Sequence, residues 1–132
     1  MKALDTNVIL RFLLNDDRAQ GLRVKKLFEA SERSGARFEI TWPVVLETVW
    51  VLSAVYEFQR SEILDALELL AQMPILEFED YDRLLQLIRL GRGTRAHLPD
   101  LLIGIAAKSC GCEATLTFEK GLTKTGLFEQ LS

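Results

Sequence analysis

The chain has few of the residues that build the commonest reactive and cross-linked sites. Its 132 residues include one histidine, which excludes zinc sites built on paired histidines and acid-base mechanisms that need two imidazoles. Its two cysteines, Cys110 and Cys112, are separated by one glycine. This spacing is too short for an easy disulfide, and the second ligand pair of a zinc site is missing. We therefore expect reduced thiols and a functional site made of oxygen ligands.

Long apolar runs are also missing. The longest one, Trp42 to Tyr56, contains a glutamate, and it is shorter than the about 20 apolar residues that a helix needs to cross a bilayer. The opening Met-Lys-Ala-Leu-Asp lacks the apolar core and the small-residue cleavage site of a secretory signal. We expect a cytoplasmic protein with no membrane span.

Positive charge is in short supply as well. The net charge is -3 and the pI is near 5.2, so no global positive field attracts nucleic acid. Any nucleic-acid binding must therefore be local. The best local patch is the glycine-broken segment 89–97, in which Arg89, Arg92 and Arg95 are the candidate RNA-binding residues. A solvated loop is the alternative interpretation of this segment.

The chain does have the pattern of a globular α/β protein, in which short apolar runs alternate with amphipathic segments. The expected strands are 2–5, 37–40, 75–78 and 114–118. The expected helices are 6–14, 16–33, 43–56, one capped by Ser61 that ends near Met73, 80–90, and one that begins at Pro99 and is closed by Gly111. This alternation predicts a central, mostly parallel sheet flanked by helices, in a single domain over residues 1–132.

Four carboxylates, Asp5, Glu47, Asp100 and Glu119, are each set in or beside an apolar run. We expect them to be partly buried and to converge, because ligands of open parallel sheets collect beyond the carboxyl ends of the strands, where Asp5 and Glu119 are expected. Converging buried carboxylates repel one another unless a cation neutralises them. The four acids therefore predict a divalent-metal site.

Three of these acids also have simpler interpretations. Asp5 could cap the helix that follows it, and Asp100 could complement the dipole of its own helix. Glu119 could be an exposed turn residue. Glu47 has no such local role, because its neighbours three and four positions away are apolar.

An all-carboxylate pocket selects Mg²⁺ or Mn²⁺, which commonly bridge carboxylates to phosphate oxygens. Such a site can activate water for in-line hydrolysis of a phosphodiester. Neither a P-loop nor a G-x-G-x-x-G sequence is present, so nucleotide-triphosphate and dinucleotide chemistry are not expected. A phosphatase that acts on a small metabolite is one alternative function. It lacks the expected D-x-D pair, since Asn7 occupies the second position.

Four segments together resemble the PIN-domain ribonucleases. They are Ala-Leu-Asp5-Thr-Asn7, the segment around Glu47, Pro99-Asp100-Leu-Leu-Ile-Gly, and Gly111-Cys-Glu-Ala-Thr-Leu-Thr117-Phe. Their order and spacing match the family over essentially the whole chain. Within that family, the length is most similar to the VapC group, the toxin half of type II toxin-antitoxin pairs.

The resemblance implies a PIN fold and a Mg²⁺- or Mn²⁺-dependent endoribonuclease, usually a homodimer, that cuts RNA such as transfer RNA. It also implies a VapB-like antitoxin that covers the cleft. Asp5 and Asp100 match the direct metal ligands of the family, and Glu47 matches the acid that binds metal or orients its water. Supporting positions are matched by Thr6, Asn7 and Thr117.

The fourth acid departs from the family pattern, which usually reads Thr-Phe-Asp where this chain has Thr117-Phe118-Glu119. Glutamate extends the carboxylate by about 1.5 Å, whereas productive sites tolerate only about 0.5 Å of misplacement. The alternative function is therefore a catalytically weak or idle PIN-like module that binds RNA or a partner protein.

Overall fold

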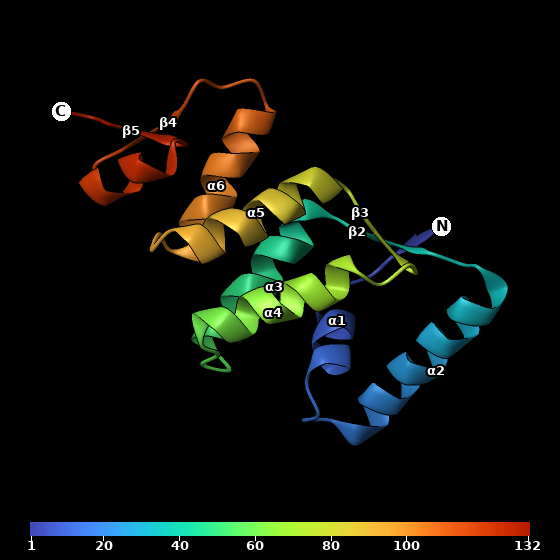
Figure 1. The fold of residues 1–132 in the computed structure, drawn as a ribbon. Helices are drawn as coiled ribbons and strands as arrows, with labels where there is room; N and C mark the ends of the chain where they lie inside the picture. The colour runs from blue at the N-terminus through green and yellow to red at the C-terminus, as the bar shows by residue number, and fades with distance from the viewer. The chain divides into compact units, whose positions relative to one another are not determined.

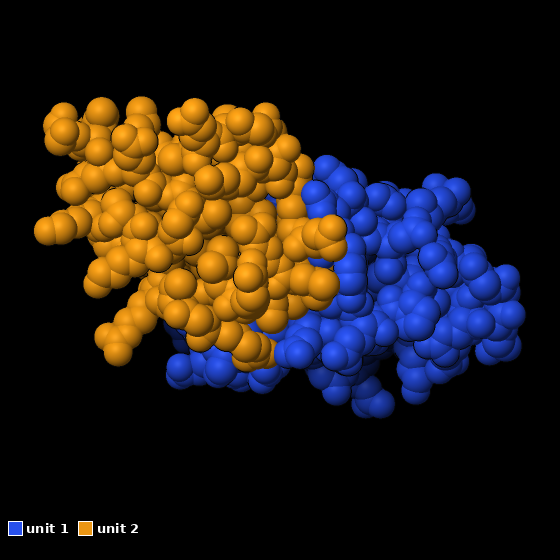
Figure 2. Space-filling model, turned by 45° about the horizontal axis from the view of Figure 1, so that its top comes forward, with its two compact units in different colours: residues 1–81 blue, residues 82–132 orange.

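The computed structural model describes all 132 residues. The chain divides into two compact units, Met1–Tyr81 and Asp82–Ser132, which Figure 2 shows in blue and orange. None of the helices has the length and apolar character required to cross a membrane.

The first unit is built on a three-stranded parallel sheet. Its strands are β1 (Lys2–Ala3), β2 (Phe38–Ile40) and β3 (Leu76–Phe78), in the order β1-β2-β3 (Figure 1). Phe38 lies opposite Lys2 of β1 and Leu76 of β3, so β2 is the central strand. Phe38 and Ile40 are buried, which explains why this short run forms the middle of the sheet.

Four helices complete the first unit: α1 (Thr6–Leu13), α2 (Arg18–Ser34), α3 (Trp42–Ala54) and α4 (Arg60–Ala71). Helix α1 packs against α2 and α3, α3 packs against α4, and α4 packs against β3. Helix α2 ends at Gly35, whose φ of +78° is a left-handed conformation that glycine adopts without strain.

The predicted cap of α4 was wrong. Ser61 lies inside the helix, and Gln59 is the N-cap residue, with its backbone N–H donating to the carboxylate of Glu62 at 2.8 Å. Glu62, three residues after the cap, thus satisfies the backbone N–H of the cap residue itself, as in a capping box.

The second unit pairs two parallel strands beside a helix. Helix α6 (Leu98–Ser109) packs on β4 (Thr115–Thr117), and β4 pairs with β5 (Phe128–Gln130), with Thr115 opposite Phe128. A 3₁₀ helix, η1 (Lys120–Thr125), connects the strands and packs on β5. Neither η1 nor β5 was predicted from the sequence. Parallel strands flanked by helices confirm the α/β class.

Helix α5 (Tyr81–Gly93) begins at the last residue of the first unit. The sequence predicted that it would end at Leu90 and fray at the glycines, but it continues for three more residues. Gly91 is buried within it. A helix tolerates one glycine at a cost of about 1 kcal/mol, which packing offsets when that glycine is buried.

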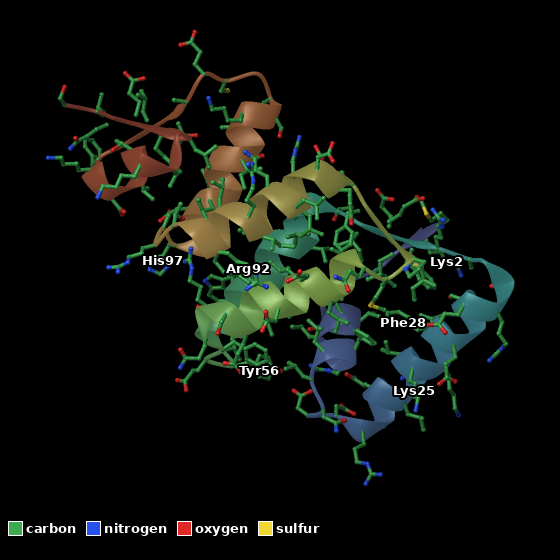
Figure 3. The ribbon with its side chains drawn as sticks, viewed as in Figure 1. Lys2, Lys25, Phe28, Tyr56, Arg92 and His97 are labelled. Atoms are coloured by element: carbon green, nitrogen blue, oxygen red, sulfur yellow. The ribbon has the colours of Figure 1, made fainter.

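Three side chains tie the end of α1 to the end of α3. Asp16 accepts a hydrogen bond from the Tyr56 hydroxyl at 2.7 Å, and its other oxygen lies 2.7 Å from Arg11. Figure 3 labels Tyr56. The hydrogen bond from Tyr56 is the main cause that lowers the pKa of the Asp16 carboxyl, and the positive charge of Arg11 adds to it.

Removing the Tyr56 hydroxyl should therefore raise the pKa of Asp16. Because that pKa is lowered in the folded protein, Asp16 contributes stability that is present above its unfolded pKa and is lost as the pH falls through the folded value. We expect Tyr56→Phe to move the carboxyl titration of Asp16, followed by ¹³C NMR, toward the ordinary aspartate range. Tyr81→Phe, which alters an exposed tyrosine elsewhere, should leave it unchanged. An identical midpoint in Tyr56→Phe would rule out the hydrogen bond as the cause.

Close packing of α6 on β5 gives a second prediction. A Cβ added at Gly104 would lie 2.8 Å from the Phe128 ring and 2.9 Å from Leu127 Cβ, which is closer than real side chains approach. We expect Gly104→Ala to lower the free energy of unfolding by about 1–3 kcal/mol, as overpacked cores do. The measurement is chemical denaturation. The matched control is Gly21→Ala in α2, where the new Cβ has an ordinary 3.6 Å neighbour. A Gly104→Ala protein as stable as wild type would contradict this packing.

Candidate active site

A cavity of about 510 Å³ in the second unit contains two of the four candidate acids. Asp100 and Glu119 both line it, although they are separated in sequence and come from different elements. Three side chains that can carry positive charge, Arg95, His97 and Lys124, line the same cavity. It therefore combines hard oxygen ligands with groups that bind anions.

Asp100 is placed by the start of α6. His97 is the N-cap residue, Pro99 stands in the first turn, and Asp100 follows it. Leu98 and Leu101 on either side of this turn are buried, so the backbone of Asp100 is anchored to the core. The Asp100 side chain is half-buried, and its carboxylate has no hydrogen bond or ion pair within the protein.

Glu119 is placed by the end of β4. It is the N-cap residue of η1, and its backbone N–H donates to the Thr117 hydroxyl at 3.1 Å. The carbonyl oxygen of Thr117 accepts a hydrogen bond from Leu131 at 2.7 Å, so both sides of Thr117 are engaged. Thr117, a supporting position by resemblance, thus orients the backbone of Glu119. The Glu119 carboxylate is exposed and makes no ion pair.

Asp5 and Glu47 belong to the first unit. Asp5 is the N-cap of α1, where one carboxylate oxygen accepts a hydrogen bond from the Thr6 N–H at 2.8 Å. The Thr6 side chain is buried, and its hydroxyl has no hydrogen-bond partner. Asn7 lines a different cavity of the same unit, between α1 and α2, together with Arg11. The capping role considered for Asp5 is therefore present.

The expectation that all four acids are partly buried was wrong for three of them. Asp5, Glu47 and Glu119 are exposed, and only Asp100 is half-buried. The apolar residues three and four positions from Glu47 suggested a core position. One of them, Trp50, is 55% exposed, and the adjacent Leu46 is 39% exposed, so this side of α3 is not part of the core.

The donor set is compatible with a divalent cation but does not complete a site within either unit. Neither unit by itself gathers three or more His, Cys, Asp or Glu side chains as a metal-binding cluster. In the second unit, Asp100 and Glu119 supply two carboxylates that form no ion pair within the protein. Two such ligands fit Mg²⁺ or Mn²⁺, which keep several waters and use one or two carboxylates together with substrate phosphates.

The predicted basic loop is mostly helical. Arg89 and Arg92 lie in α5, and of the three candidate arginines only Arg95, in the connection to α6, lines the cavity. His97 lies in the predicted basic segment 89–97 but was not singled out as a site residue, and Lys124 was not predicted at all. His97, labelled in Figure 3 before the start of α6, could have been found from its place three residues before Asp100. Nothing in the sequence singles out Lys124, because η1 was not predicted.

Comparison with known proteins gives two matches that cover nearly the whole chain. The family model described as PIN domain matches residues 2–127. The chain is also similar to the VapC ribonuclease of Aquifex aeolicus (strain VF5), with 25% identity over 126 residues, which are 96% of this chain and 93% of that protein. The resemblance found in the sequence is thereby confirmed, and the chain belongs to the PIN domain family.

Proposed function

We propose that the chain is a Mg²⁺- or Mn²⁺-dependent endoribonuclease that acts as the toxin of a type II toxin-antitoxin pair. The observation that carries the proposal is the placement of Asp100 and Glu119, with unpaired carboxylates, in one cavity with Arg95 and Lys124. Carboxylates can bind a metal ion, and positively charged side chains can bind phosphate. Membership of the PIN domain family supports a nuclease over other metal-dependent hydrolases.

In this proposal residues 1–132 act as a single catalytic domain. Asp5 and Asp100 are the metal ligands, and Glu119 completes the acidic set. Glu47 accepts a hydrogen bond from the attacking water and orients it. Thr6, Asn7 and Thr117 support the site, of which Thr117 holds the backbone of Glu119. The bound metal supplies a Lewis acid that polarises the phosphoryl group and lowers the pKa of water.

The reaction that this arrangement supports is hydrolysis of a phosphodiester. The water oxygen forms a bond to phosphorus, the bond from phosphorus to the leaving ester oxygen breaks, and the proton released by the water is taken up by the leaving oxygen. The carboxylate of Glu47 is exposed and has no protein partner, so it is free to hold the water during the first step.

The partners follow from the same proposal. The relative is named a VapC ribonuclease, which supports RNA as the substrate, and we extend this to transfer RNA. A VapB-like antitoxin would inhibit the enzyme, and the active form would be a homodimer in the cytoplasm. The alternative, a weak or idle module that binds RNA or a partner protein, is favoured by one observation: a glutamate stands at the fourth acidic position.

Removing the charge of Asp100 tests the metal mechanism. Because ligand loss weakens the metal site, we expect Asp100→Asn to reduce cleavage of a fluorescent oligoribonucleotide in Mn²⁺ by at least roughly 100-fold, more than the loss of an outer partner of a metal ligand costs. The matched control is Asp82→Asn, which changes an exposed aspartate in the first turn of α5.

Two results would overturn this mechanism. Cleavage that persists in EDTA, or that Asp100→Asn leaves intact, would show that metal bound by Asp100 is not used. An idle module would instead give no cleavage in any preparation. It would also show no rise in melting temperature with Mn²⁺, whereas an intact site is stabilised by RT ln(1 + [M]/Kd).

The fourth acid gives a sharper prediction. Shortening Glu119 to the residue usual in the family brings the carboxylate about 1.5 Å nearer the backbone, so we expect Glu119→Asp to cleave RNA at the same rate or faster. The measurement is the single-turnover rate at saturating Mn²⁺. Glu113→Asp, at an exposed glutamate outside the cavity, is the control. A fall of tenfold or more in Glu119→Asp alone would mean that the longer side chain is matched to this site.

A further inference from the structure

The cavity of the second unit contains two permanently charged cations as well as its two carboxylates. Arg95 comes from the connection between α5 and α6, and Lys124 comes from η1. Both side chains are exposed, so solvent and a ligand can reach them. Neither was singled out by the acidic pattern that predicted the site.

Opposite charges in this cavity do not pair with one another. No carboxylate oxygen of Asp100 or Glu119 lies within 4.0 Å of a nitrogen of Arg95 or Lys124. The two cations also have no hydrogen-bond partner elsewhere in the protein. A structural role would normally show as an ion pair, as it does for Arg11 with Asp16. Unpaired carboxylates and unpaired cations in one cavity instead suit the binding of a positively charged and a negatively charged group together.

Lys124 projects from a segment that hydrogen bonds hold in place. The Thr123 hydroxyl donates to the carbonyl of Lys120 at 2.8 Å, and the Thr125 hydroxyl donates to the carbonyl of Leu122 at 2.7 Å. The side chain of Leu122 is buried and anchors the turn. The backbone of Lys124 is therefore fixed between two bonded threonines.

Arg95 is held in a similar way. The hydroxyl of Thr94 donates to the carbonyl of Leu90 at 2.7 Å and accepts from the N–H of Ala96 at 3.4 Å. These bonds tie the connection to the end of α5 on both sides of Arg95. The backbone that carries each cationic side chain is thus positioned before any ligand binds, which reduces the entropy lost on binding.

We propose that Arg95 and Lys124 form a phosphate-binding subsite that holds the RNA backbone beside Asp100 and Glu119. This inference rests on the proposed ribonuclease function. In this arrangement the acids would hold the metal ion and the two cations would bind phosphodiester oxygens, so that each set of charges has its own ligand. A planar guanidinium can bind a phosphate through two N–H groups, and an ammonium binds it as a point charge.

Salt-dependent binding tests the subsite without relying on cleavage. The full chain would be titrated into a labelled single-stranded oligoribonucleotide in EDTA, with fluorescence anisotropy recorded at several KCl concentrations. Each phosphate contact contributes a slope of about -0.7 in log K against log [salt] for single strands, equivalent to roughly fivefold in affinity at 0.1 M salt. We expect Lys124→Ala and Arg95→Ala each to lose about this slope and affinity. Lys124→Arg should restore both.

The matched control is Lys108→Ala, which removes an exposed lysine from the last turn of the same unit's α6, outside the cavity. It should keep the wild-type slope. Unchanged slopes in Lys124→Ala and Arg95→Ala, with circular dichroism showing both variants folded, would overturn the subsite. The subsite would also be overturned if wild-type protein bound no RNA, or if Arg95 and Lys124 bound only an acidic protein segment.

The failure of this inference can be told apart from the failure of the proposed function. A subsite without a nuclease would give the expected loss of slope in both variants but no Mn²⁺-dependent cleavage by wild type. A nuclease without this subsite would cleave RNA in Mn²⁺ while Lys124→Ala and Arg95→Ala bind with wild-type slopes. The second result overturns the inference and leaves the proposed function standing.

Discussion

The packing of α6 against the two-stranded sheet is the constraint on which the second unit depends. Gly104 provides the room for this contact, because any side chain there would meet Leu127 and Phe128. Leu101 and Ile105, on the same helix, are fully buried. With α6 fixed on β4 and η1 fixed on β5, Asp100 and Glu119 have little freedom to separate. Their shared cavity is thus a consequence of apolar packing rather than of attraction between polar groups.

The charges in that cavity contribute little to stability, and this suits a binding site. An exposed ion pair is worth only about 0–1 kcal/mol, so leaving Arg95, Lys124 and the two acids unpaired costs the fold little. Groups that have no partner in the protein are available to a ligand. The ion pairs of Arg11 with Asp16 and of Arg37 with Glu77, at 2.7 and 2.9 Å, lie in the first unit and involve none of these four residues.

Much of the fold was predictable because local signals were strong. Pro43 near the start of α3, Gly35 after α2 and the strand Phe38–Ile40 each match the structure within about two residues. Two local predictions were wrong. Gly91 stays helical because it is buried within α5, and Gln59 replaced Ser61 as the cap of α4.

The candidate site was predictable in part. The sequence named Asp100, Glu119 and Arg95, which line one cavity, but it could not find Lys124, whose position depends on a 3₁₀ helix and a fifth strand with weak local signals. The exposure of a side chain was harder to predict. Whether Glu47 is buried depends on what its side of α3 faces, and not on its neighbours in the sequence. Arg92, which was expected beyond the end of the helix 80–90, lies in α5 because this helix continues through Gly91 to Gly93.

The central claim is that Asp100 and Glu119 bind one metal ion in the cavity of the second unit. Paramagnetic broadening by Mn²⁺ tests it most directly, because the effect falls steeply with distance from the ion. In ¹⁵N-labelled protein with substoichiometric Mn²⁺, we predict that amide signals at and next to Asp100 and Glu119 broaden together in the wild type and stay sharp in Asp100→Asn. Broadening that spares these signals, or that Asp100→Asn leaves unchanged, would contradict the claim.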